Sequence, residues 1–141
     1  MDDERQTGAM TGRHMQIGEA AERVGLSIRT IRHYEDAGLV IPSARSDGGF
    51  RLYTEPDLDR LRVVKRMKPL SFTLDDMRGL LHVLDELATG AAQGEHLAAL
   101  RDRLAMFHQA AEERVQALRE QLHTAEGFAQ QIREQIDRHG N

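Results

Sequence analysis

The side chains best suited to chemistry are basic and hydroxyl-bearing residues grouped within one short segment. Arg29, Thr30, Arg32, His33 and Tyr34 lie within six positions of one another. Arginine pairs with guanine edges and with phosphate oxygens, and threonine and tyrosine hydroxyls bond phosphate. A helix that presents these side chains on one face therefore has the chemistry to contact a nucleic acid.

Three small or apolar residues predict the element that would position this group. Ala21, Gly25 and Ile31 have the spacing of a helix-turn-helix, with Ser27 as the N-cap of the second helix. A small residue lets the two helices approach, glycine makes the turn, and a branched side chain anchors the second helix inside. This spacing alone is equally compatible with an ordinary pair of helices that has a solvated basic face.

The segment that follows predicts a wing and two more helices. Residues 39–53 combine a short apolar run, a Gly48-Gly49 turn signal and an alternating stretch, which indicate a small β-hairpin. Thr54 and Thr73 each precede an aspartate by three residues, as in a helix N-cap. We therefore expect one winged helix-turn-helix type of domain over 16–88, with its helix-turn-helix at about 18–37.

A long helix with a narrow apolar stripe is predicted over residues 95–137. Its apolar residues recur every three or four positions as a heptad seam, with one four-residue stutter near Ala111. One helix cannot bury such a stripe, so a partner helix is expected. A small-residue linker at 89–94 precedes it, and flexible tails are predicted at 1–15 and 138–141. The predicted dimerisation residues are Leu97, Leu100, Leu104, Phe107, Val115, Leu118, Leu122, Ile132 and Ile136.

The run from Ile17 to Tyr53 closely resembles the MerR family of mercury-resistance-type regulators. The resemblance lies in Thr30-Ile-Arg-His-Tyr-Glu35, in Gly49-Phe-Arg-x-Tyr53, and in a segment beginning Leu70-Ser-Phe-Thr. It implies a mainly helical fold, in which a winged helix-turn-helix domain with a small β-hairpin wing precedes a long C-terminal coiled-coil dimerisation helix. Ser71 stands where the family usually has glycine.

The resemblance also implies a function and a set of contacts. A homodimer with an antiparallel coiled coil would bind a pseudo-palindromic element in double-stranded promoter DNA. Activating members of the family bend and untwist such an element so that RNA polymerase can engage the promoter, and RNA polymerase is the expected further partner if this chain is an activator. The DNA-contacting residues carried over from the family, with the exposed His33 added, are Arg29, Thr30, Arg32, His33, Tyr34, Arg45, Arg51, Tyr53, Arg62, Lys65 and Arg66. Two simpler alternatives remain: Tyr34 as a core residue, and the last three as a solvated face.

Composition excludes several classes of function. The chain has 141 residues and no cysteine, so thiolate metal sites, iron–sulfur clusters and cysteine nucleophiles are ruled out. The net charge is −4, yet residues 16–68 carry a net +2 and residues 69–141 a net −5. No metal or cofactor is expected; a half-site of His82 and Glu86 is the weak alternative. No nucleophile–base pair indicates an enzyme, and no membrane span or signal peptide is predicted, so we expect a bacterial cytoplasmic, nucleoid-associated protein.

Other hypotheses fit the same residues. An architectural dimer that bends DNA would have the same elements, and so would a coiled-coil interaction protein whose winged domain binds protein. A small-molecule effector is unidentified; a pocket between the fourth helix and the coil, with Leu84, Leu87, Met106 and Phe107, is one possible place for it.

Overall fold

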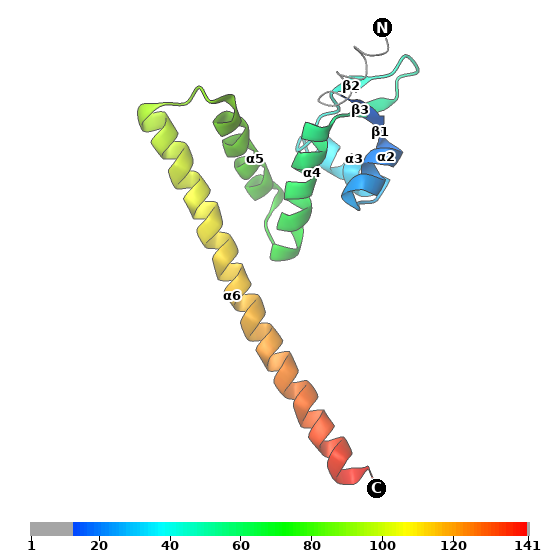
Figure 1. The fold of residues 1–141 in the computed structure, drawn as a ribbon, viewed down its shortest axis with the longest axis vertical. Coiled ribbons are helices and arrows are strands. Elements are labelled where there is room, and N and C mark those ends of the chain that lie inside the picture. The colour runs from blue at the N-terminus through cyan, green and yellow to red at the C-terminus, as the bar shows by residue number, and fades with distance from the viewer. Residues whose placement is uncertain (1–12, 141) are drawn as a thin grey trace. The chain divides into compact units, whose positions relative to one another are not determined.

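The computed structural model describes residues 13–140 and divides the chain into two compact units. The first unit ends at Ala92 and the second begins at Gln93. Figure 1 shows short helices and a small sheet in the first unit, and one long helix in the second. Residues 1–12 of the predicted tail lie outside the described residues.

The first unit is mainly helical and carries a small antiparallel sheet. Its helices are α2 (Ile17–Val24), α3 (Ile28–Asp36), α4 (Glu55–Met67) and α5 (Leu74–Thr89), with a 3-10 turn at Lys68–Leu70. Its strands are β1 (Met15–Gln16), β2 (Ala44–Arg45) and β3 (Arg51–Tyr53). This arrangement confirms the predicted helical fold with a hairpin wing.

Polar side chains cap the helices where the sequence predicted. The Ser27 hydroxyl accepts the Thr30 N–H at 3.0 Å at the start of α3. Thr54 with Asp57, and Thr73 with Asp76, form reciprocal capping boxes at the starts of α4 and α5. Because the first N–H groups of a helix lack partners within it, these caps fix where each helix begins.

The sheet has the strand order β1-β3-β2 and corrects two predictions. Met15 pairs with Tyr53 and is 2% exposed, so the predicted tail ends before it. A two-residue strand is too short to show a periodic signal, and the strand with which it pairs lies far along the chain. Leu39 and Val40 were expected in the hairpin, but they are buried ahead of it, and the hairpin begins at Ala44.

The core of the first unit gathers side chains from all its helices and from the sheet. Ala21 and Ile31, predicted to join the two helices of the helix-turn-helix, are both buried. Around them lie the other buried apolar residues: Met15, Ala20, Val24, Tyr34, Leu39, Val40, Tyr53, Leu58, Leu61, Val64, Met67, Met77 and Leu81. Helix α3 is therefore held rigidly on its inner side, which leaves its outer side as a fixed surface.

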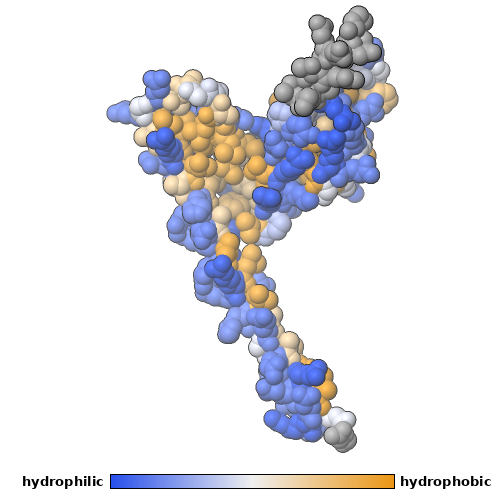
Figure 2. Space-filling model, in the orientation of Figure 1, coloured by the Kyte–Doolittle hydropathy of each residue, from blue (hydrophilic) through white to orange (hydrophobic). Residues whose placement is uncertain are grey.

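The second unit is the single helix α6 (Gly94–His139). It starts one residue before the predicted helix and ends two residues after it, so Arg138 and His139 are helical and not part of a tail. Large apolar side chains on its second half are exposed: Leu118, Leu122, Phe128, Ile132 and Ile136. Figure 2 shows this apolar surface as an orange line along the otherwise hydrophilic helix. No helix among the described residues is both long and apolar enough to cross a membrane.

Candidate nucleic-acid interface

The turn between α2 and α3 depends on Gly25. Its φ is +71°, and its N–H donates to the Ala21 carbonyl at 2.9 Å. A Cβ at this position would also lie 2.7 Å from the Lys65 Nζ. That ammonium donates to the Val24 carbonyl at 2.8 Å and so caps the end of α2 from α4. Glycine is thus favoured by the left-handed backbone, and a larger residue would also displace the flexible end of Lys65.

Helix α3 presents Arg29, Arg32 and His33 to solvent. Within the part of the chain that the structure describes, neither arginine has an ion-pair partner. Thr30 is half-buried at the helix start, and its hydroxyl accepts a hydrogen bond from Ser27 at 2.8 Å. The outer face of α3 is therefore a basic surface whose two guanidinium groups are unpaired among the described residues.

Tyr34 does not belong to this surface. It is 3% exposed, and burial raises the pKa of its phenol. The prediction that Tyr34 contacts DNA is wrong, because it lies three residues after Ile31 and so falls on the same inner face of the helix. The alternative reading of Tyr34 as a core residue is confirmed.

Two arginines from other helices hold the chain where α3 ends. The N–H groups of Gly38 and Leu39 donate back to Glu35 and Tyr34 in a Schellman motif. The Ala37 carbonyl accepts from Arg78 Nε at 3.1 Å and Nη2 at 2.9 Å. The Leu39 carbonyl accepts from Arg60 Nε at 3.1 Å. Helices α4 and α5 thereby fix the end of α3 through its backbone.

Glu35 joins α3 to the wing. Its carboxylate accepts from Arg51 Nε and from the Tyr53 hydroxyl, each at 2.8 Å. Burial favours the neutral acid, but hydrogen bonds from Arg51 and Tyr53 and the charges of Arg51 and Arg45 outweigh it, so the pKa of Glu35 is lowered. Burial and the bond to Glu35 raise the pKa of Tyr53. The wing is consequently locked to the helix that carries the exposed arginines.

This lock changes the roles expected for two wing residues. Tyr53 is fully buried, so its predicted phosphate contact is wrong: it lies opposite Met15 on the inner face of the sheet. Arg51 is half-buried and ion-paired with Glu35. Arg45 is exposed, and its Nη1 donates to the Gly49 carbonyl at 3.0 Å across the wing turn. Phe50, the residue after Gly49, is 62% exposed.

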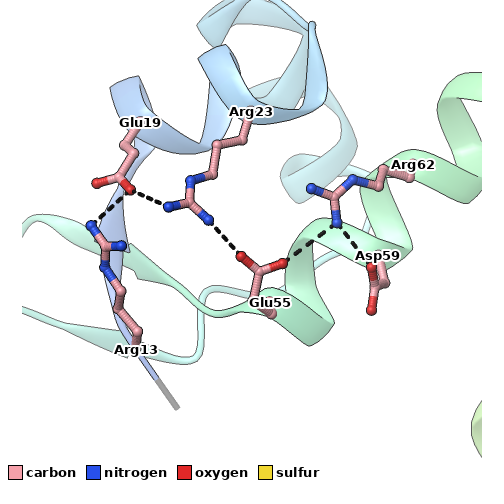
Figure 3. Close-up of polar contacts among 6 residues, drawn as sticks. All are labelled: Arg13, Glu19, Arg23, Glu55, Asp59 and Arg62. Carbon is pink, nitrogen blue, oxygen red and sulfur yellow. Dashed lines mark hydrogen bonds and ion pairs between the residues drawn. The ribbon is translucent and has the colours of Figure 1, made fainter. Parts of the chain in front are cut away.

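The predicted phosphate-contacting residues of α4 differ in how far their charges are already committed. Figure 3 shows an alternating chain of ion pairs in which Arg62 bridges Glu55 at 3.5 Å and Asp59 at 2.9 Å. Glu55 also pairs with Arg23 at 2.7 Å, and the chain continues through Glu19 to Arg13. Arg62 is therefore neutralised locally, although exposed pairs of this kind hold weakly enough for a phosphate to compete.

A basic cleft lies between the end of α2 and the end of α4. It has a volume of about 590 Å³ and is lined by Arg23, Val24, Arg62, Lys65, Arg66, Pro69 and Leu70. The three predicted residues of α4 thus lie together. Arg62 is the member of that set with ion pairs, and among the described residues none is found for Lys65 or Arg66. Lys65 has a structural role as the cap of α2.

Sequence reasoning missed the residues that position this surface. Glu35 was noted only as part of a motif, and Arg60 and Arg78 had no role assigned. Arg23 was also missed, although it lies in the last turn of α2 and lines the same cleft as Arg62. Their partners are backbone carbonyls or side chains that are distant in sequence, so no local pattern of residues could have indicated them. Among the described residues, no three histidine or acidic side chains gather as a metal site.

Comparison with known proteins places this arrangement in a family. The model of the MerR helix-turn-helix regulatory proteins matches residues 15–84. The mercuric resistance operon regulatory protein of Bacillus cereus is 43% identical over 70 residues, which are 50% of this chain and 53% of that protein. A probable heavy metal-dependent transcriptional regulator of Haemophilus influenzae is 36% identical over 64% of this chain and 74% of its own length.

A solved structure extends the similarity of fold along the chain. HiNmlR, described as a MerR family regulator lacking the sensor domain and bound to promoter DNA, has a TM-score of 0.68 at 21% identity. The superposition covers 91% of this chain and 92% of that one. The chain spans only about half the length of the Bacillus cereus regulator. On the family model and the Haemophilus match, the chain belongs to the MerR family of DNA-binding transcriptional regulators.

Proposed function

We propose that two copies of this chain bind a pseudo-palindromic promoter element and regulate transcription by bending and untwisting it. Each copy inserts the outer face of α3 into the major groove and sets its wing on the flanking backbone. Contacts at the two ends of the element offset the cost of deforming its centre. Where the outcome is activation, RNA polymerase is the second partner.

One observation carries this proposal: the exposed arginines and the wing belong to a single rigid surface. Arg29 and Arg32 are exposed on α3, and the same helix holds the wing through the bonds of Glu35 to Arg51 and Tyr53. A groove contact and a backbone contact can therefore be made together without rearrangement. Arg66 and the cleft beside it add positive charge at one edge of this surface.

The corrected residue set is smaller than the sequence predicted. We assign Arg29, Arg32 and His33 to the groove, and Arg45 and Arg66 to phosphate. Thr30, Arg51, Lys65 and Arg62 hold the surface in place or are already paired, whereas Tyr34 and Tyr53 belong to the core. Specific recognition then depends on few side chains, in keeping with the net charge of only +2 over residues 16–68.

Footprinting on the DNA upstream of the chain's own gene tests the proposal. We expect a protected inverted repeat, with enhanced cleavage between its halves where the DNA is deformed. Arg32→Ala should weaken binding by about tenfold to a hundredfold. Arg103→Ala, a matched loss of an exposed arginine on α6, should leave binding unchanged. Affinity that is equal for Arg32→Ala and the unchanged protein would overturn the assignment of α3 as the reading helix.

A genome-wide binding map separates a promoter regulator from an architectural protein. A few sites at promoters are expected from the proposal. Many dispersed sites without a shared inverted repeat would favour the architectural dimer, and binding to no DNA would favour a protein-interaction module.

A further inference from the structure

The apolar seam of α6 carries information about how two copies would pair. From Ala111 to Ile136 it follows one uninterrupted heptad, with Ala111, Leu118, Ala125 and Ile132 at one core position and Val115, Leu122, Ala129 and Ile136 at the other. Its large members from Leu118 onward are exposed. Residues 97–107 lie before the stutter and do not share this phase.

We propose that two α6 helices pair antiparallel along residues 111–136, with the two-fold axis between His123 and Thr124. This inference rests on the proposed dimer and adds its register. In an antiparallel coil the two core positions face each other. With the axis at this point, the facing core residues form eight layers, which consist of four different residue pairs that each occur twice.

Side-chain volume supports this register. Leu122 faces Ala125 of the other helix, and Leu118 faces Ala129. Further out, Val115 faces Ile132. In the outermost layer, Ala111 faces Ile136. Six of the eight layers therefore combine a large side chain with an alanine, which fills the space between helices without voids or overpacking. A parallel dimer would instead place Ala125 against Ala125 and Leu122 against Leu122, alternating gaps with crowded layers.

Charge supports the same register independently. The heptad positions flanking one side of the seam hold Glu112, Arg119, Glu126 and Arg133, which alternate in sign and are exposed. In the proposed register the nearest flanking neighbours across the dimer are Glu112 with Arg133 and Arg119 with Glu126. Each pair occurs twice, so four pairs of opposite charge form. Flanking charges of this kind select partner and orientation in coiled coils.

Both registers shifted by one heptad are disfavoured on both grounds. The shift toward the N-terminus sets Leu118 against Leu122 and brings Arg119 beside its own copy. The shift toward the C-terminus moves the axis to Gly127, leaves six layers, and sets Ala125 against Ala129 at the centre. It also brings Arg119 beside Arg133 and Glu126 beside its own copy. A parallel dimer likewise brings Arg114 of one helix beside Arg119 of the other. The seam and its flanks therefore agree on one arrangement.

Cysteine cross-linking in the full-length chain tests the register, because the chain has no cysteine of its own. In the variant Leu118→Cys/Ala129→Cys, each new thiol should face the other kind across the dimer, and mild oxidation should give a covalent dimer. The matched control is Leu118→Cys/Ile136→Cys, whose thiols face each other only in the register centred on Gly127. One heptad is about 10 Å of helix, beyond the reach of a disulfide.

A charge exchange provides a second test that leaves the apolar core untouched. Glu126→Lys should weaken dimerisation about tenfold or more, because it places a lysine beside Arg119 twice in the dimer. The double variant Arg119→Glu/Glu126→Lys should restore it. Glu134→Lys makes the same charge change on the outward face of α6 and should have little effect.

The outcomes separate the register from the dimer itself. A covalent dimer of the 118/129 variant, together with rescue by the double charge exchange, would support the proposal. Cross-linking of the 118/136 variant, or of neither variant when the unaltered chain sediments as a dimer, would overturn the register and leave the proposed function standing. A monomer in sedimentation would overturn both.

Discussion

Glu35 is a carboxylate that links the recognition helix to the wing. Arg51 and Tyr53 donate to it at 2.8 Å, and its side chain is only 14% exposed. Burial alone would raise its pKa, but the two hydrogen bonds and the charges of Arg51 and Arg45 favour the charged form and lower it. A group whose pKa is lower in the folded state stabilises that state above its unfolded pKa, and this stabilisation is lost as the pH falls through the folded value.

The pH dependence of unfolding should therefore change when Glu35 loses its charge. We expect Glu35→Gln to lower the free energy of unfolding at pH 7 by about 1–3 kcal/mol. As the pH falls below 5, the free energy of unfolding of this variant should decrease less than that of the unaltered protein, because the variant has no carboxylate at position 35 to protonate. Urea titrations across pH measure both effects, with Glu22→Gln, an exposed glutamate of α2, as the control. If Glu35→Gln and the unaltered protein lost the same free energy of unfolding at acid pH, the role of Glu35 would be contradicted.

Ser71 shows how a departure from the family pattern acts on the backbone. It follows the 3-10 turn that ends α4 and has a φ of +66°, in the left-handed region that glycine adopts without strain. We expect Ser71→Gly to be neutral or to stabilise the fold by up to about 1 kcal/mol, and Ser71→Val to destabilise it by about 1–2 kcal/mol. Thermal unfolding of the two variants checks this. A valine as stable as the serine would show that the turn can change its backbone conformation.

At the scale of elements, the sequence predicted the helices better than the sheet. Helix starts are coded locally: Thr54 with Asp57 and Thr73 with Asp76 are capping boxes that can be recognised within four residues. The strand β1 is not, because Met15 is defined only by its pairing with Tyr53, thirty-eight positions later. Tyr34 was misplaced for a different reason: with Ile31 buried, helical geometry already placed Tyr34 on the inner face, but its hydroxyl suggested a contact with DNA.

Arg78 couples α5 to the end of the recognition helix. It donates twice to the Ala37 carbonyl and forms an ion pair with Asp75 on its own helix. We expect Arg78→Ala to leave the fold intact but to loosen the Schellman turn after α3, because that carbonyl loses both donors from α5. Amide exchange of Gly38 and Leu39 should then accelerate about tenfold, as expected for the loss of roughly 1–1.5 kcal/mol.

The same variant should bind promoter DNA less tightly, since α3 would be held less rigidly. Arg101→Ala, on α6 and outside the first unit, is the control for a lost arginine. Unchanged exchange at both amides would show that Arg60 and the core hold the turn without Arg78.

For the whole molecule, charge is distributed by segment more than by overall composition. The net −4 hides a positive segment at 16–68, which carries the helix-turn-helix and the wing, and an acidic remainder at 69–141, so the overall sign was a poor guide to nucleic-acid binding. The sequence could predict the mainly helical fold, the wing and the long helix because each has a local or periodic signal. It could not predict the bonds of Glu35, Arg60 and Arg78, because these join elements that are distant in sequence and leave no periodic trace.

The division into two units makes dimerisation separable from DNA contact. The core of the winged domain lies wholly within the first unit, so a chain truncated after Gly94 should still unfold cooperatively. We expect it to sediment as a monomer, because the exposed seam of α6 has been removed. Each domain would then bind a half-site alone, and affinity for the complete inverted repeat should fall by about a hundredfold to ten-thousandfold.

Affinity for an isolated half-site provides the internal control for this truncation. It should be similar for the truncated and full-length chains, because α3 and the wing are the same in both. If the truncated chain bound the complete repeat as tightly as the full-length chain, α6 would contribute nothing to recognition. If it lost the half-site as well, α6 would be needed for the winged domain itself, and the loss of affinity could not be attributed to a missing partner.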